Sequence, residues 1–113
     1  MDAGDAEALY VVRFWVRPDG GQAVIDWLDR RHMAEVARQP GFLWAKRCRL
    51  EQDADDGWQA HLMVYGLASR EALEAYFQSD ARRRFMEEGS AFRDLMRAER
   101  SWGTVAAATG AGR

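Results

Sequence analysis

Cysteine, proline and histidine are scarce in this chain of 113 residues, which contains one cysteine, two prolines and two histidines. The single cysteine, Cys48, excludes an internal disulfide framework. Metal-binding spacings such as Cys-x-x-Cys or His-Glu-x-x-His are also missing. We therefore expect neither a metal site nor a bound cofactor.

Long apolar runs and a surplus of charge of one sign are missing as well. No run approaches the roughly 20 apolar residues that a membrane-spanning helix needs, and the acidic start lacks the features of a signal peptide. The formal net charge is -2, which gives no field to attract nucleic acid or an anionic membrane. We expect a cytoplasmic protein that binds neither.

The length fits one domain. Residues 1–7 are small or acidic, and residues 106–113 are mostly alanine and glycine, so neither segment has much apolar surface to bury. We expect flexible tails at both ends of a single domain that spans residues 8–105.

The first half of that domain shows a strand pattern followed by a helix pattern. Residues 9–16 are apolar or aromatic apart from Arg13, which predicts a strand with two covered faces. Residues 22–39 carry apolar side chains at helical spacing, with His32 near the middle of the apolar stripe and Glu35 within it. Pro40 and Gly41 predict the end of this helix. The apolar face of the strand comprises Tyr10, Val12, Phe14 and Val16, and its opposite face Leu9, Val11, Arg13 and Trp15.

The second half predicts a hairpin, two helices and a strand. Residues 42–50 and 58–66 alternate as strands around an acidic loop, with Trp44 expected on the same face as His61 and Tyr65. Ser69 and Asp80 are the expected N-caps of the helices, and the helical spacing after Asp80 extends to Met96. Residues 100–105 predict the last strand. The order βαββαβ indicates an α+β fold with helices on one face of a four-stranded antiparallel sheet.

Helices on one face leave the opposite face of such a sheet to solvent. That face is nevertheless apolar in the first strand and in the hairpin, with Leu43, Ala45, Leu62 and Val64 expected there. An exposed apolar surface of this size usually marks an interface. We therefore expect a homodimer whose sheets pack face to face.

Short segments spread over residues 9–105 resemble the DUF4286 family of small bacterial proteins. They include Trp27-Leu28, His32-Met33-Ala34-Glu35-Val36, Gly41-Phe42, Cys48-Arg49-Leu50, Val64-Tyr65, Tyr76, Phe92 and Arg100. The resemblance implies a ferredoxin-like domain of the dimeric α+β barrel superfamily, whose members pair through their sheets. That superfamily includes cofactor-free monooxygenases, haem-degrading enzymes, lactone isomerases and polyketide cyclases, but a shared fold does not transfer their chemistry.

His32 is the first candidate for chemistry, because an imidazole in an apolar stripe can take or give a proton near neutral pH. Glu35, one turn later, could orient it. His61 and Tyr65 share a strand face, and if that face looks toward the helices, one or the other could meet His32 across one cavity. The structural alternatives are that His32 locks the helix to the sheet, that His61 lies at the sheet edge, and that Tyr65 is a core residue.

Arginines on strands need partners, which for Arg47, Arg49 and Arg100 could be an internal carboxylate or a ligand. The five tryptophans could wall a planar ligand or fill the core. Our hypothesis is a homodimer that binds a small aromatic or apolar molecule and performs proton-transfer chemistry of isomerase, cyclase or monooxygenase type. The expected catalytic residues are His32, His61 and Tyr65, and the expected ligand contacts are Phe14, Glu35, Trp44, Phe85 and Arg100. The alternative is a non-catalytic dimer module whose interior is filled by its own side chains.

Overall fold

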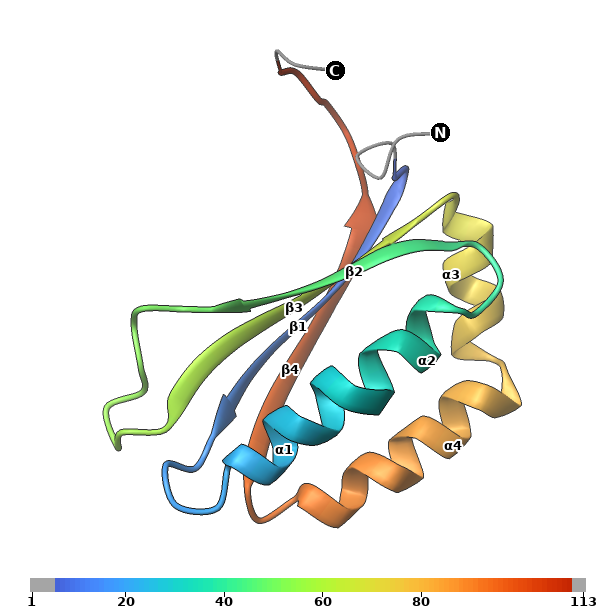
Figure 1. Ribbon diagram of the computed structural model, residues 1–113. Helices are drawn as coiled ribbons and strands as arrows, with labels where there is room; N and C mark the ends of the chain where they lie inside the picture. The colour runs from blue at the N-terminus through green and yellow to red at the C-terminus, as the bar shows by residue number, and fades with distance from the viewer. Residues whose placement is uncertain (1–5, 111–113) are drawn as a thin grey trace.

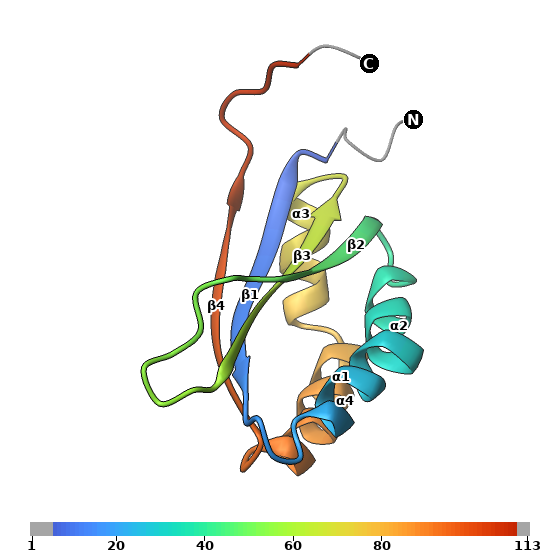
Figure 2. The ribbon, with the colours of Figure 1, turned by 60° about the vertical axis from the view of Figure 1, so that its left-hand side comes forward.

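The computed structural model describes residues 6–110, and its elements follow the predicted order βαββαβ. The strands β1 (Ala8–Val16), β2 (Phe42–Arg49), β3 (Gln59–Leu67) and β4 (Met96–Thr104) form one four-stranded antiparallel sheet in the order β2-β3-β1-β4. The helices lie together on one side of the sheet (Figure 1), and the turned view shows the other side uncovered (Figure 2). This is the ferredoxin-like α+β fold predicted from the sequence.

Strand β1 holds the centre of the sheet, because it pairs with β3 on one side and β4 on the other along its whole length. Its alternation is the predicted one. Tyr10, Phe14 and Val16 face the helices and are buried, whereas Arg13 on the opposite face is exposed. The hydrophobic core therefore lies between the sheet and the helical layer.

The helix predicted for residues 22–39 forms, but it is not uniform. It consists of α1 (Gln22–Trp27), a π turn η1 (Leu28–His32) and α2 (Met33–Ala37). The wide turn takes up one extra residue, so that Leu28 and Val36 both face the sheet and are buried. The chain then turns at Gly41, which has φ +84°; an added Cβ there would meet the Cβ of Ala72.

The second helical region comprises α3 (Arg70–Phe77), α4 (Asp80–Gly89) and the short 3₁₀ turn η2 (Ser90–Phe92). Ser69 caps α3 as predicted, since its side chain accepts a hydrogen bond from the Ala72 N–H. The prediction that Asp80 caps the next helix was wrong. Ser79 accepts from the Arg82 N–H instead, and Asp80 occupies the first turn, where its charge still favours the helix.

One strand boundary and one side-chain direction also differ from the sequence prediction. Strand β4 begins at Met96 rather than Arg100, because the chain leaves the helical region at η2 and pairs Met96 with Val16. A β-bulge between Phe42 and Trp44 shifts the alternation of β2, so that Trp44 pairs with Gly66 and lies on the face away from the helices.

The uncovered face of the sheet is apolar at its centre. Leu9 and Val11 of β1 and Leu62 and Val64 of β3 share this face and are only partly buried within the single chain. The indole of Trp44 covers Gly66 beside them, and exposed charged residues, including Arg13 and Lys46, also lie on this face.

The ends of the chain are described only in part. Of the expected tails, residues 1–5 and 111–113 lie outside the described residues. Glu7, expected in the first tail, extends the sheet, because its N–H donates to Leu67 and its carbonyl accepts from the Val105 N–H. Residues 106–110 are exposed and have no regular secondary structure. Within residues 6–110, none of the helices is both long and apolar enough to cross a membrane.

Candidate functional site

A cavity of about 240 Å³ lies between the sheet and the helices. Strands β1, β3 and β4 line it from one side, and the helix of residues 22–37, α3 and α4 from the other. Its walls are mostly apolar and aromatic, and include Phe14, Trp27, Leu28, Met63 and Phe85. A mostly apolar cavity with a few polar groups is the usual form of a small-molecule site.

The π turn at Leu28–His32 places His32 in the cavity wall. Side chains at i and i+5 point in different directions on an α-helix, whereas the wider π turn brings them together. Trp27 and His32 have this spacing, and their rings stack with centroids 4.2 Å apart. Phe85 of α4 meets the imidazole edge to face at 5.2 Å. The aromatic rings therefore fix the orientation of His32.

This aromatic environment keeps His32 uncharged at neutral pH. Burial lowers the pKa of the imidazole to about 4; the carboxylate of Glu35 opposes this shift, and the positive charge of Arg100 adds to it. The Nδ1 atom is buried and has no hydrogen-bond partner among residues 6–110. A neutral imidazole has one nitrogen that can accept a proton and one that can donate, so His32 is chemically able to do either.

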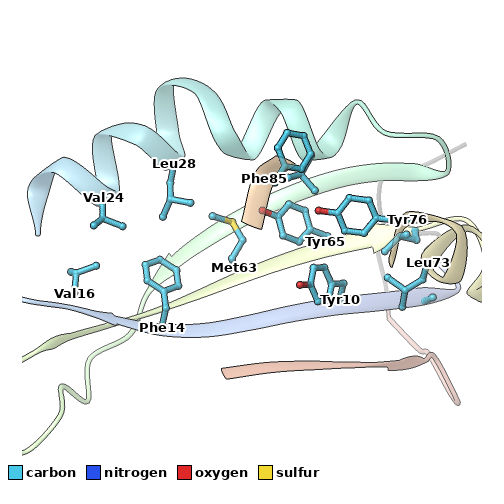
Figure 3. Packing of buried hydrophobic residues seen from close by; sticks show 13 residues of the cluster. Tyr10, Phe14, Val16, Val24, Leu28, Met63, Tyr65, Leu73, Tyr76 and Phe85 are labelled. Atoms are coloured by element: carbon cyan, nitrogen blue, oxygen red, sulfur yellow. The ribbon is translucent and has the colours of Figure 1, made fainter. Parts of the chain in front are cut away.

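Three tyrosines from different elements meet in the same cavity: Tyr10 of β1, Tyr65 of β3 and Tyr76 of α3. The Tyr10 and Tyr65 rings stack at 5.8 Å, and Figure 3 shows the three hydroxyl groups pointing the same way. No residue in the range 6–110 forms a hydrogen bond with any of these hydroxyls. Burial raises the pKa values of Tyr65 and Tyr76 well above that of free tyrosine, so both hydroxyls stay protonated and can donate.

Arg100 of β4 also lines the cavity and is itself exposed to solvent, which places its guanidinium at the opening. It pairs with Val12 in the sheet, on the helix-facing side. Two arginines of β2 bind carboxylates: Arg47 binds Asp29 at 2.7 Å, and Arg49 binds Asp53. Arg100 has no such partner among the residues that the structure describes.

The structure thus brings five of the predicted site residues into one cavity wall: Phe14, His32, Tyr65, Phe85 and Arg100. Their roles in binding and chemistry remain predictions.

His61 is not among the residues that line the cavity. Its ring stacks on that of Phe14, with the two centroids 5.0 Å apart. Arg47 approaches the His61 Nδ1 atom at 3.1 Å, and since arginine can only donate, this nitrogen must be the acceptor. Burial, assisted by Arg47 and Arg49, lowers the pKa of His61 to about 4 despite the opposing charges of Asp29 and Asp53. The buried Nε2 atom has no partner within residues 6–110. Of the two residues expected to meet His32, Tyr65 therefore lines the cavity and His61 does not, and the catalytic role of His61 stays a prediction.

Trp44 and Glu35 also lie outside the cavity wall. The bulge in β2 turns Trp44 to the opposite face of the sheet, where it cannot contact a ligand beside His32. Glu35 pairs instead with Arg31 at 3.4 Å, and Arg31 also reaches Glu88 of α4 at 3.5 Å. This contact ties the two helices together, and Glu35 influences His32 through its charge.

The predicted set of site residues omits several residues of the cavity wall, among them Tyr10, Tyr76 and Trp27, which was considered only as one of five tryptophans. Tyr10 shares a strand face with Phe14, so alternation alone could have placed it there. Trp27 could not be found in this way, because the π turn that brings it against His32 leaves no sequence signal we can name. Within residues 6–110, no cluster of three or more histidine, cysteine, aspartate or glutamate side chains forms a candidate metal centre.

Solved structures with this fold include several small enzymes. SnoaB, a cofactor-independent oxygenase from Streptomyces nogalater, is similar in a mutant form, with a TM-score of 0.62 and 24% identity over 91% of this chain and 96% of that one. The heme degrader MhuD from Mycobacterium tuberculosis, solved with two hemes in its active site, gives a TM-score of 0.63 and 20% identity over 91% and 99%. A putative antibiotic biosynthesis monooxygenase from Deinococcus radiodurans gives a TM-score of 0.69 and 6% identity over 94% and 99%. At these identities the likeness establishes the fold.

A search of curated proteins finds no match. The model of a domain of unknown function, DUF4286, matches residues 7–102, which covers every helix and most of each strand described above. This chain therefore belongs to the DUF4286 family.

Proposed function

We propose that this protein is a homodimer that binds a small aromatic molecule in the cavity of each subunit and transfers a proton to or from it, with His32 as the proton acceptor or donor. The observation that carries the proposal is the cavity itself, which joins a neutral imidazole to three tyrosine hydroxyls without protein partners among residues 6–110. An interior filled by its own side chains, as the non-catalytic alternative requires, would leave no such space.

The cavity residues have separate roles in this proposal. Aromatic walls from Phe14, Trp27 and Phe85 suit a flat apolar ligand, and protonated tyrosine hydroxyls suit an oxygen on that ligand. A hydroxyl that donates to a ligand oxygen stabilises the negative charge that develops there when His32 removes a proton. Proton removal of this kind is common to isomerisation, cyclisation and oxygenation without a cofactor. The similarity to a cofactor-independent oxygenase favours oxygenation among these three.

Proton transfer can be tested without knowledge of the natural substrate. 2-Tetralone is a bicyclic aromatic ketone with acidic C–H bonds, and their exchange with deuterium is followed by NMR. We expect the wild-type protein to accelerate exchange, and His32→Gln to lower the protein-catalysed rate by about a hundredfold or more. Glu74→Gln, on the exposed side of α3, is the control. Equal exchange rates in the two variants would show that His32 is not the proton acceptor. A wild-type protein that does not accelerate exchange would contradict the proposed proton transfer.

The dimer is supported by the apolar centre of the uncovered sheet face, which includes Val11, Leu62 and Val64. Packing this face against a second copy removes it from water. Sedimentation velocity should therefore give a dimer for the wild type and a monomer for Val64→Lys, which places a charge near the middle of the interface. A wild type that stays monomeric at high concentration would reject the dimer.

A further inference from the structure

Arg100 differs from the other residues that line the cavity because its side chain carries a charge. The other ionisable side chains that line the cavity are His32 and the three tyrosines, and no carboxylate is among them. Tyr65 and Tyr76 are protonated at neutral pH and His32 is neutral, as shown above. Arg100 therefore gives this apolar space a formal positive charge.

That charge acts on the interior of the site. The guanidinium lowers the pKa values of His32, Tyr65 and Tyr76, so its field reaches all three groups. The guanidinium of the strand residue Arg47, by contrast, is occupied by the carboxylate of Asp29. Because no residue in the range 6–110 supplies one to Arg100, its donors are available to a ligand.

We propose that the cavity selects an aromatic carboxylate, with the carboxylate held by Arg100 at the opening and the rings enclosed by the apolar walls. This inference rests on the proposed function, because it assumes that the cavity binds an aromatic molecule. The planar guanidinium has several N–H donors in a fixed fork that matches the two oxygens of a carboxylate. The volume of about 240 Å³ falls below the about 300–1,000 Å³ of sites for drug-sized molecules, so the ligand is a small one, such as a two-ring acid.

A matched pair of probes separates charge from shape. 2-Naphthoate is ionised at neutral pH, whereas 2-naphthamide has nearly the same shape and no charge. Titration calorimetry with the wild type should show about tenfold tighter binding of the acid than of the amide. The ratio is modest because Arg100 is exposed to solvent. Raising the salt concentration from about 0.05 M to about 0.5 M should reduce this preference, since salt screens exposed charges.

Variants then assign the preference to one residue. Arg100→Gln should abolish the preference for the acid, because it weakens binding of the acid far more than binding of the amide, and Arg100→Lys should restore part of the preference. Arg38→Gln removes the same charge from an exposed position outside the cavity wall and should retain the full preference.

Each of the other possible binding results would contradict a specific part of the proposal. Equal binding of acid and amide by the wild type would refute the carboxylate inference and leave aromatic binding intact. A preference that survives Arg100→Gln would assign the recognition to another group and refute it too. If the wild type binds neither probe, both this inference and the proposed function fail.

Discussion

The two histidines, of which His61 is buried and His32 is half-buried, should make the stability of this protein depend on pH in a window where few other groups titrate. Both imidazoles have pKa values lowered to about 4, whereas in the unfolded chain they return to about 6.5. The unfolded state therefore binds more protons than the native state between these two values. Stability is complete above about pH 6.5 and is lost as the pH falls towards 4.

The size of the effect follows from the two pKa values. For one histidine, a fall from about pH 7 to about pH 5 costs about 2 kcal/mol, so the pair costs about 4 kcal/mol. Domains of this size are stable by only about 5–15 kcal/mol, so the change is a large fraction of the total. The carboxylates of Asp29, Asp53 and Asp56 do not interfere in this range. Their pKa values are lowered by hydrogen bonds from Arg47, Arg49 and Arg97, so the stability they provide is lost mainly at lower pH.

Urea unfolding at about pH 7 and about pH 5, at one protein concentration, measures this difference directly. His32→Gln and His61→Gln should each remove about half of the pH dependence, and NMR titration of the ring protons should give the individual pKa values. A wild-type stability that changes by less than about 1 kcal/mol over this range would refute the reasoning, because the imidazoles would then be taking up protons in the native state at little cost.

Three further outcomes are expected, each measured by urea unfolding at neutral pH. Gly66→Ala should destabilise by about 1–3 kcal/mol because its Cβ would meet the Trp44 indole, and Trp44→Ala in the same chain should recover most of the loss. Arg47→Met should cost about 1 kcal/mol through its ion pair with Asp29, since that pair is partly exposed; NMR should show a higher pKa for His61. Phe85→Ala, which empties a buried ring position beside the cavity, should cost about 3–5 kcal/mol.

The fold could be predicted because local patterns and global packing agree along most of the chain. The apolar run from Leu9 to Val16, interrupted by Arg13, identifies the central strand, and Gly41 marks the turn between the helical region and the hairpin. Ser69 caps its helix as its residue type predicts. Each of these signals lies within a few neighbouring residues, so the sequence displays it directly.

The errors arose where one residue changes the register of those that follow. The bulge before Trp44 reverses the face on which that side chain lies, and nothing in the residue types around it marks the bulge. The prediction of the site residues lacked positional information of a similar kind. Alternation placed Phe14, Tyr65 and His61 on the helix-facing side, but it did not show which of them lie along the cavity. His61 was therefore a candidate for the cavity wall, whereas in the structure it stacks on Phe14 and is outside that wall.

Some of the features that depart from ordinary folding rules lie at the cavity. The helix widens into a π turn at Leu28–His32, the Nδ1 atom of His32 has no partner within residues 6–110, and Arg100 is the charged group left at the opening. The π turn and the unpartnered nitrogen are each unfavourable for stability, whereas the exposed guanidinium of Arg100 is not. Local conflicts that gather in one place are typical of a site kept for function, because a sequence selected for stability alone would remove them. An α-helical turn in place of the π turn would separate the ring of His32 from that of Trp27. The geometry of the imidazole therefore depends on this π turn, and that dependence is a structural reason to look for a ligand there.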